Sequence, residues 1–140
     1  MTLAPYLNFD GRCEEAIAYY KSALGAEVDM LMRFKDAPKN PSQGCCEMPP
    51  GTENKIMHAA LRIGGSLLMA SDCHCQNKPE FKGVSLNLTA RDDAQAAKIF
   101  AALSDGGSVC VPLNKTFFAS SFGVVTDRFG VTWMVAVVTM

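Results

Sequence analysis

The hydrophobic residues of this chain recur with two different spacings, which predict a strand followed by a helix. Leu7 and Phe9 alternate with Tyr6 and Asn8, as in a short, half-buried strand. The next apolar residues recur at intervals of three and four, as on one face of a helix: Cys13, Ala16, Ile17, Tyr20 and Leu24. Asp10 precedes this segment and is placed to cap the predicted helix.

A second strand and a hairpin follow. Residues 26–34 have strand character, and residues 55–72 contain two apolar runs separated by a Gly-Gly pair, which is typical of a two-residue hairpin turn. The first arm has one apolar face: Met57, Ala59, Leu61 and Ile63. Alternation directs His58 and Arg62 to the opposite face.

The same order of patterns then starts again. The predicted strand at residues 84–90 has Val84, Leu86 and Leu88 on one face and Ser85, Asn87 and Thr89 on the other. A predicted helix covers residues 91–107, and its apolar stripe consists of Ala96, Ile99, Phe100 and Leu103. Three further strands are predicted at residues 108–113, 121–127 and 131–138.

The chain therefore predicts the order β-α-β-β-β twice, an α+β fold in which each helix covers one sheet face. We interpret residues 1–140 as one domain made of two modules, at about 1–75 and 81–140. Residues 35–55 hold four prolines and two glycines with little periodicity, which predicts a long loop.

Composition narrows the classes of function. The chain has 140 residues, 49% of them hydrophobic and 19% charged, and a formal net charge of −1. This charge gives no basic surface for nucleic acid. No apolar run approaches the roughly 20 residues that span a bilayer, so no membrane partner is expected. The first residues lack the charged and apolar regions of a signal peptide, which predicts a cytoplasmic protein.

Six cysteines suit that reducing compartment as free thiols. Cys13 and Cys110 lie in predicted elements and are expected to be buried. The other four lie in predicted loops: Cys45, Cys46, Cys73 and Cys75. The run "DCHC" contains a lone C-x-C pair, whereas a closed zinc site needs four ligands. Whether these four thiols bind a metal or oxidise is left open by the sequence.

Three segments resemble a known family: "YLNFDGRCEEAIAYYKSALGAE", "HAALRIGGSLLMASD" and "FGVVTDRFGVTWMVAV". They are similar to the PhnB-like group of the vicinal oxygen chelate superfamily, which includes glyoxalases, bleomycin-resistance proteins and dioxygenases. Domains of this group often carry the label 3-demethylubiquinone 3-methyltransferase. The resemblance implies that the two modules form one curved, bowl-shaped mixed sheet and that the protein is a homodimer.

The resemblance also allows a test for the metal site of the superfamily. Its metalloenzymes place a His on the first strand of each module and a Glu on the last strand. The positions near the match hold Pro5, Tyr6 or Asn8 on the first strand, Ser85 or Asn87 on the fifth, and Met134 on the last. Hard divalent cations prefer imidazole and carboxylate ligands, so no metal and no other cofactor is expected. No glycine-rich strand-to-helix turn is present for an adenosyl cofactor.

Alternation gives a set of candidate ligand-binding residues for the concave side of the bowl: His58, Arg62, Ser85, Asn87, Phe117 and Trp133. The register of the last strand decides whether Trp133 or Met134 faces that side. His58 is the candidate acid or base, because imidazole titrates near neutral pH. Phe117 and Phe118 are expected at the rim.

These residues predict a metal-free protein that binds a small organic molecule in the bowl. One alternative is an enzyme of the same superfamily. It would be either a metal-dependent lyase, dioxygenase or isomerase, or a metal-independent enzyme that uses His58. Another alternative is a structural dimer whose bowl is filled by its own side chains.

Overall fold

The computed structural model describes residues 1, 3–9, 11–36, 53–72 and 81–138. Most of the loop expected at 35–55 lies outside these ranges, as does the predicted cap Asp10. The four loop cysteines also lie outside them: Cys45, Cys46, Cys73 and Cys75. The described chain divides into two compact units, Met1–Pro79 (unit 1) and Glu80–Met140 (unit 2).

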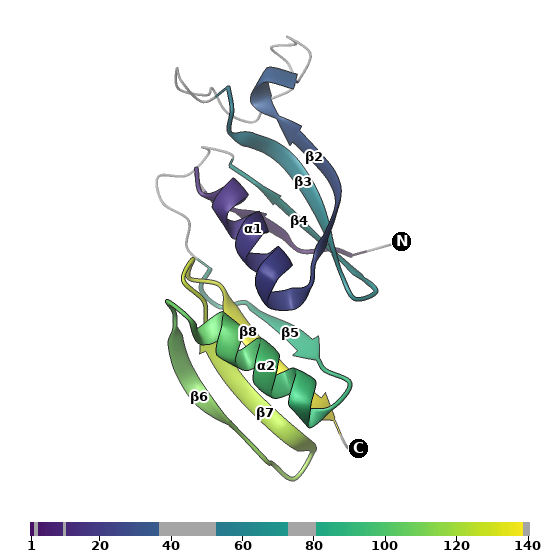
Figure 1. The fold of residues 1–140 in the computed structure, drawn as a ribbon, viewed down its shortest axis with the longest axis vertical. Helices are drawn as coiled ribbons and strands as arrows, with labels where there is room; N and C mark the ends of the chain where they lie inside the picture. The colour runs from purple at the N-terminus through teal and green to yellow at the C-terminus, as the bar shows by residue number, and fades with distance from the viewer. Residues whose placement is uncertain (2, 10, 37–52, 73–80, 139–140) are drawn as a thin grey trace. The chain divides into compact units, whose positions relative to one another are not determined.

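Unit 1 is a four-stranded sheet with one long helix against one face (Figure 1). Its elements are β1 (Tyr6–Asn8), α1 (Cys13–Leu24), β2 (Glu27–Arg33), the 3₁₀ turn η1 (Phe34–Asp36), β3 (Ile56–Ile63) and β4 (Ser66–Ser71). The strand order is β1-β4-β3-β2, with β1 parallel to β4 and the other pairs antiparallel. The predicted elements are all present, and η1 was not predicted.

Unit 2 repeats this arrangement. Its elements are β5 (Ser85–Thr89), α2 (Asp93–Ser104), β6 (Ser108–Asn114), β7 (Ala119–Thr126) and β8 (Thr132–Val138). The strand order is β5-β8-β7-β6, and β5 is parallel to β8. The predicted α+β fold of two β-α-β-β-β modules is confirmed. The bowl concerns both modules together and stays a prediction.

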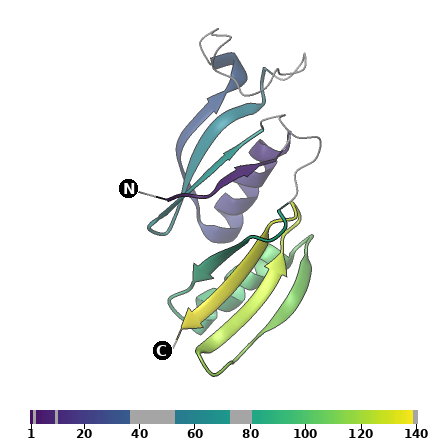
Figure 2. The same cartoon turned by 180° about the vertical axis from the view of Figure 1, so that it is seen from behind.

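Each helix packs through the apolar stripe that the sequence predicts. In α1 the buried residues are Cys13, Ala16, Ile17 and Tyr20, and in α2 they are Ala96, Phe100 and Leu103. Figure 2 shows, for each unit by itself, the sheet face turned away from the helix of that unit. We call this the far face. No helix in the described ranges is long and apolar enough to cross a membrane.

The two helices begin in different ways. The Asp92 side chain accepts a hydrogen bond from the Gln95 backbone N–H (2.8 Å), and the Gln95 amide oxygen accepts one from the Arg91 N–H (2.9 Å). This local exchange satisfies two backbone donors near the start of α2. Arg12, which precedes α1, makes no side-chain cap. The free N–H groups of α1 must therefore find another acceptor.

That acceptor is Asp72, which follows β4 and has no exposed surface. Its Oδ1 accepts hydrogen bonds from the backbone N–H groups of Gly11 and Cys13 (2.8 Å each). Its Oδ2 accepts one from the Ile56 N–H at 3.0 Å. One carboxylate thus joins the start of α1 to the beginning of β3 and the end of β4.

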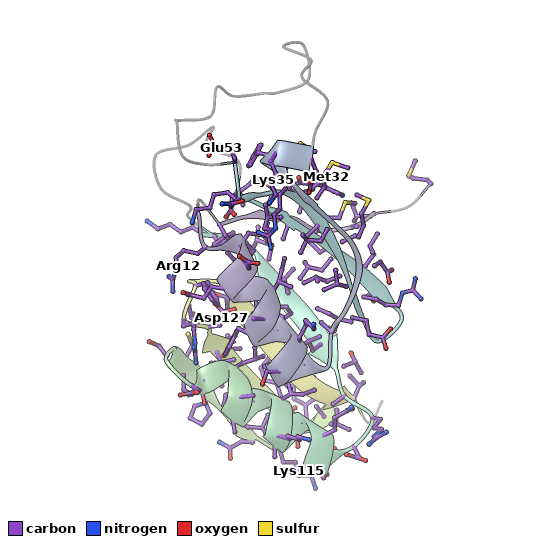
Figure 3. The ribbon with its side chains drawn as sticks, turned by 45° about the horizontal axis from the view of Figure 1, so that its top comes forward. Arg12, Met32, Lys35, Glu53, Lys115 and Asp127 are labelled. Atoms are coloured by element: carbon purple, nitrogen blue, oxygen red, sulfur yellow. The ribbon has the colours of Figure 1, made fainter. Side chains whose placement is uncertain are left out.

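Unit 2 has a buried carboxylate of its own, Asp127, between β7 and β8 (Figure 3). Its Oδ1 accepts the backbone N–H groups of Phe129 (2.9 Å) and Val131 (3.1 Å). Its Oδ2 accepts the Trp133 indole N–H at 2.8 Å. These bonds hold the predicted turn at residues 127–130 in place and anchor the indole inside the unit.

Cys13 is fully buried, as predicted, and this gives a testable pH effect. Burial raises the pKa of the Cys13 thiol, and the negative charges of Asp72 and Glu14 add to the increase. Above about pH 8.5 an unfolded thiol loses its proton, whereas the folded one keeps it, so rising pH favours unfolding. We expect the free energy of unfolding of the wild type to fall by about 1 kcal/mol more than that of Cys13→Ala between pH 8 and pH 9.5. Urea titrations at both pH values check this, and equal losses in the two proteins would contradict it.

Candidate functional site

The strand register fixes which side chains share the far face of unit 1. Ala59 and Leu61 of β3 are fully buried on the helix side, so His58, Ala60 and Arg62 lie on the far face. One row of paired residues across the sheet is Met30, Ala60, Met69 and Tyr6. In the next row Met32 pairs with His58. Three methionines therefore share this face with a histidine and a tyrosine.

His58 and Tyr6 form one polar pair on this face. The register partners Ser71 and Asn8 form another, in which the Ser71 hydroxyl donates to the Asn8 amide oxygen at 2.8 Å. The Tyr6 hydroxyl lies 3.3 Å from His58 Nδ1, and the ring centroids are 5.6 Å apart. Tyr6 comes from β1 and His58 from β3, with β4 between them. The contact occupies one ring nitrogen of His58 and leaves Nε2 for other chemistry.

Arg62 lies near the β3–β4 turn and is largely exposed. Its guanidinium forms an ion pair with Asp29 of β2 at 2.8 Å. Glu27 is its register partner on β2. The charge of Arg62 is thus matched by acidic neighbours at one end of the sheet, away from the Tyr6–His58 pair.

The four strands of unit 2, as far as the structure describes them, contain no charged residue. Ser85 pairs with Thr132, and Asn87 pairs with Met134. On the next strand Val124 is the partner of Met134. Ser85 and Asn87, both predicted from alternation, do share one face, and both are exposed.

A chain of hydroxyl and thiol groups crosses the same face. The Thr126 hydroxyl lies 3.2 Å from the Thr132 hydroxyl and 3.5 Å from the Cys110 sulfur. Cys110 is exposed. The expectation that it is buried is wrong, because β6 lies at the sheet edge and has a register shift between Val109 and Val111.

Two aromatic candidates have different environments. Trp133 pairs with Leu86 and Val125, is 2% exposed and bonds to Asp127, so it lies on the helix side. The expectation that Trp133 shares a face with Ser85 and Asn87 is therefore wrong by one residue of register, and Met134 lies on that face instead. Phe117 is 89% exposed and stacks edge-on with Phe118, at a centroid distance of 5.1 Å.

Phe118 in turn stacks edge-on with Phe122 at 5.3 Å. Phe122 pairs with Ala136 on the far face of unit 2. The three rings therefore form an aromatic path from the β6–β7 connection to the far face. Sequence reasoning places Phe117 and Phe118 at the rim but does not find Phe122, because the pairing of β7 with β8 decides where Phe122 points.

Among the strand positions that the resemblance matches to the superfamily metal ligands, those with side-chain donor atoms hold Tyr6, Asn8, Ser85, Asn87 and Met134. Their donors are a phenol, two amides, a hydroxyl and a thioether, which do not fit a hard divalent cation. Within the ranges that the structure describes, no three His, Cys, Asp or Glu side chains come together as a metal site.

Comparison with known proteins gives a family and several similar structures. The family model described as 3-demethylubiquinone-9 3-methyltransferase matches residues 1–136. Protein YjdN of Escherichia coli K12 is 38% identical over 99% of this chain and 96% of its own length.

Solved structures agree with this match. Protein PA1353 of Pseudomonas aeruginosa is 42% identical, with a TM-score of 0.84 and coverage of 98% of this chain and 97% of its own. A Bacillus cereus PhnB protein, titled a putative 3-demethylubiquinone-9 3-methyltransferase, is 25% identical, with a TM-score of 0.78 and coverage of 98% and 99%. A glyoxalase/bleomycin resistance protein of Albidiferax ferrireducens is 13% identical, with a TM-score of 0.61 and 96% coverage of each chain, and shares the fold.

Proposed function

Because this chain belongs to the 3-demethylubiquinone-9 3-methyltransferase family, a PhnB-like branch of the vicinal oxygen chelate superfamily, we propose that it binds a small organic molecule on the far faces of its sheets. We also propose that it does so without a divalent metal ion. The cytoplasmic location and the homodimer stay predictions.

The observation that carries this proposal is the make-up of the far face of unit 2. Asn87 presents an amide beside the thioether of Met134 and the side chain of Val124. Thr126 and Thr132 add hydroxyl groups, and no charged side chain lies in these paired rows. A few polar groups among apolar ones are typical of sites for small organic molecules. A neutral ligand with an aromatic part and one hydrogen-bonding group suits this surface best.

The side chains at the positions matched to metal ligands do not fit Zn, Ni, Mn or Fe(II), and this supports ligand binding without these ions. An amide or thioether cannot replace imidazole and carboxylate for these ions. We expect protein purified without a tag to carry far less than one equivalent of each of these metals, as measured by inductively coupled plasma mass spectrometry. A stoichiometric amount of any of them would overturn the metal-free part of the proposal.

The family description names a methyl transfer, and the strand-to-helix connections do not favour it here. An adenosyl cofactor usually sits on a glycine-rich connection, where the backbone approaches the ligand closely. Residues 9–12 contain the single glycine Gly11, and residues 90–92 contain none. We therefore propose ligand binding in preference to methyl transfer.

The Tyr6–His58 pair favours a second candidate, metal-independent catalysis. A His58 ring oriented by a tyrosine can take up or release a proton at Nε2. Under this second hypothesis, His58→Gln abolishes turnover of a bound molecule and leaves its affinity within about twofold. Under the binding hypothesis no turnover is detected with either protein.

A titration with phenol and benzamide fragments tests the binding site. We expect the backbone amide signals of Asn87 and Met134 to shift, as monitored by two-dimensional NMR. Asn87→Leu should weaken fragment binding about tenfold, which corresponds to about 1.4 kcal/mol. Ser104→Ala, on the exposed end of α2, is the matched control and should bind as the wild type does. Shifts confined to α1 and α2, or equal affinities for all three proteins, would contradict the proposed site.

A further inference from the structure

We propose that the far face of unit 1 holds a site for a soft monovalent cation of the Cu(I) class. The ligands are Nε2 of His58 and the thioether sulfurs of Met30, Met32 and Met69. This site goes beyond the proposed function and does not rest on it, because every ligand lies in unit 1, whereas the observation that carries the proposed function is the far face of unit 2 around Asn87.

The strand register brings these four side chains to one place. Met32 on β2 is the direct partner of His58 on β3, so their Cβ atoms are roughly 5 Å apart. Met30 and Met69 flank Ala60 in the neighbouring row. Because Ala60 ends at Cβ, it leaves room above it for the two flexible methionine side chains to converge. Met32 lies at the end of β2 that leads into η1 (Figure 3).

The Tyr6 contact prepares His58 for this role. Metal-binding histidines usually bond through their second ring nitrogen to a neighbouring group, which fixes the ring. Tyr6 makes such a contact at Nδ1 and comes from the β1 side of the ring. Nε2 is thereby the nitrogen left for a cation, and the register partner Met32 lies on the other side of His58, on β2.

The donor chemistry selects the kind of cation. Thioethers are soft, neutral ligands that favour Cu(I), whereas Mg, Ca and Mn need oxygen ligands and Zn needs imidazole, thiolate or carboxylate. The acidic side chains near this face, Glu27 and Asp29, lie at the Arg62 end. His58, Met32 and Met69 are half-buried and Met30 is 44% exposed. Met30 is thus the most exposed of the four ligands, and a cation from solvent can reach the site from its side.

Ag(I) is the probe for the test, because it is a soft monovalent cation without redox chemistry under these conditions. The full chain is labelled with ¹³C at its methionine methyl groups, and its reactive thiols are alkylated with iodoacetamide so that they do not compete. Silver nitrate should shift the methyl signals of Met30, Met32 and Met69 with saturation near one equivalent. The signal of Met134, the methionine on the far face of unit 2, is the internal control and should not move.

Three substitutions distinguish one defined site from Ag(I) binding at separate thioethers. His58→Gln should weaken Ag(I) binding at the three methionines at least tenfold, and Met134→Leu should leave it unchanged. Ala60→Ser tests the geometry with little change in volume and should retain binding. Equal shifts at Met134 and at the three methionines, or an unchanged affinity in folded His58→Gln, would overturn the proposal. Failure here would leave the fragment titration at Asn87 unaffected, so the two proposals fail separately.

Discussion

Asp72→Ala is expected to lower the free energy of unfolding by about 3 kcal/mol or more, because three backbone N–H groups, two of them buried and one partly buried, lose their acceptor. A buried donor left unsatisfied costs about 1–3 kcal/mol. Gly11, Cys13 and Ile56 all donate to this one carboxylate, at 2.8 to 3.0 Å. The loss is less than the sum of three separate costs, because the substitution also removes the free-energy cost of burying the Asp72 charge.

Asp92→Ala is the matched control for this prediction. Asp92 caps α2 with one hydrogen bond at an exposed position, so its loss should cost about 1 kcal/mol. Asp72→Asn keeps one carbonyl oxygen and presents an NH₂ group to the remaining donor, so it should fall between the wild type and Asp72→Ala. Urea unfolding followed by circular dichroism gives all four stabilities. Equal losses for Asp72→Ala and Asp92→Ala would show that the three-donor network contributes nothing beyond an ordinary cap.

The comparison of Asp72 with Asp92 shows how two copies of one module satisfy the same requirement differently. Both helices begin with unpaired N–H groups. In unit 2 the acceptor is one residue before the helix and is visible as a local sequence pattern. In unit 1 the acceptor lies 59 residues away from Cys13, at the end of β4. The start of α1 therefore depends on the formation of the sheet, whereas the start of α2 has its own cap.

The secondary structure could be predicted from the sequence because periodicity is a local property. The stripes of α1 and α2 and the alternation in β3 and β5 follow directly from the 3.6- and 2-residue repeats. The Gly-Gly hairpin turn is local as well, because the residue pair itself favours a two-residue turn. Ser85 and Asn87 were correctly placed on one face by the alternation within a single strand.

The candidate site was harder to predict because it depends on pairing between strands. Trp133 was assigned to the wrong face, since the end of the Asp127 turn sets the register of β8. Tyr6 and His58 are 52 residues apart, and no local pattern indicates that their side chains meet. The methionines of β2 and β4 likewise share a face only through Ala60, which pairs with both strands. Alternation within a strand predicts which of its residues share a face. Which strands pair, and in which register, is seen only in the structure.

Gly107→Ala should destabilise unit 2 by about 3 kcal/mol, because overpacking against backbone typically costs 1–3 kcal/mol and a flexible neighbour is absent here. A Cβ at Gly107 would overlap the Thr126 carbonyl oxygen and come within 3.0 Å of the Asp127 backbone. Moving Asp127 would also strain its bond to the indole of Trp133. The chain has one tryptophan, so a change in its fluorescence should accompany the lower urea midpoint.

Gly65→Ala is the matched control for Gly107→Ala, since both add one methyl group at a glycine next to a strand. A Cβ at Gly65 meets nothing within 4 Å, and its backbone is not in the left-handed region. Removing a glycine there reduces the freedom of the unfolded chain, so stability should stay equal or rise by up to about 1 kcal/mol. A Gly107→Ala protein with the midpoint and fluorescence of Gly65→Ala would mean that Thr126 and Asp127 can move away freely. The hydrogen bonds of Asp127 would then adapt to the added methyl group, and they would not be what holds Trp133 in its buried position.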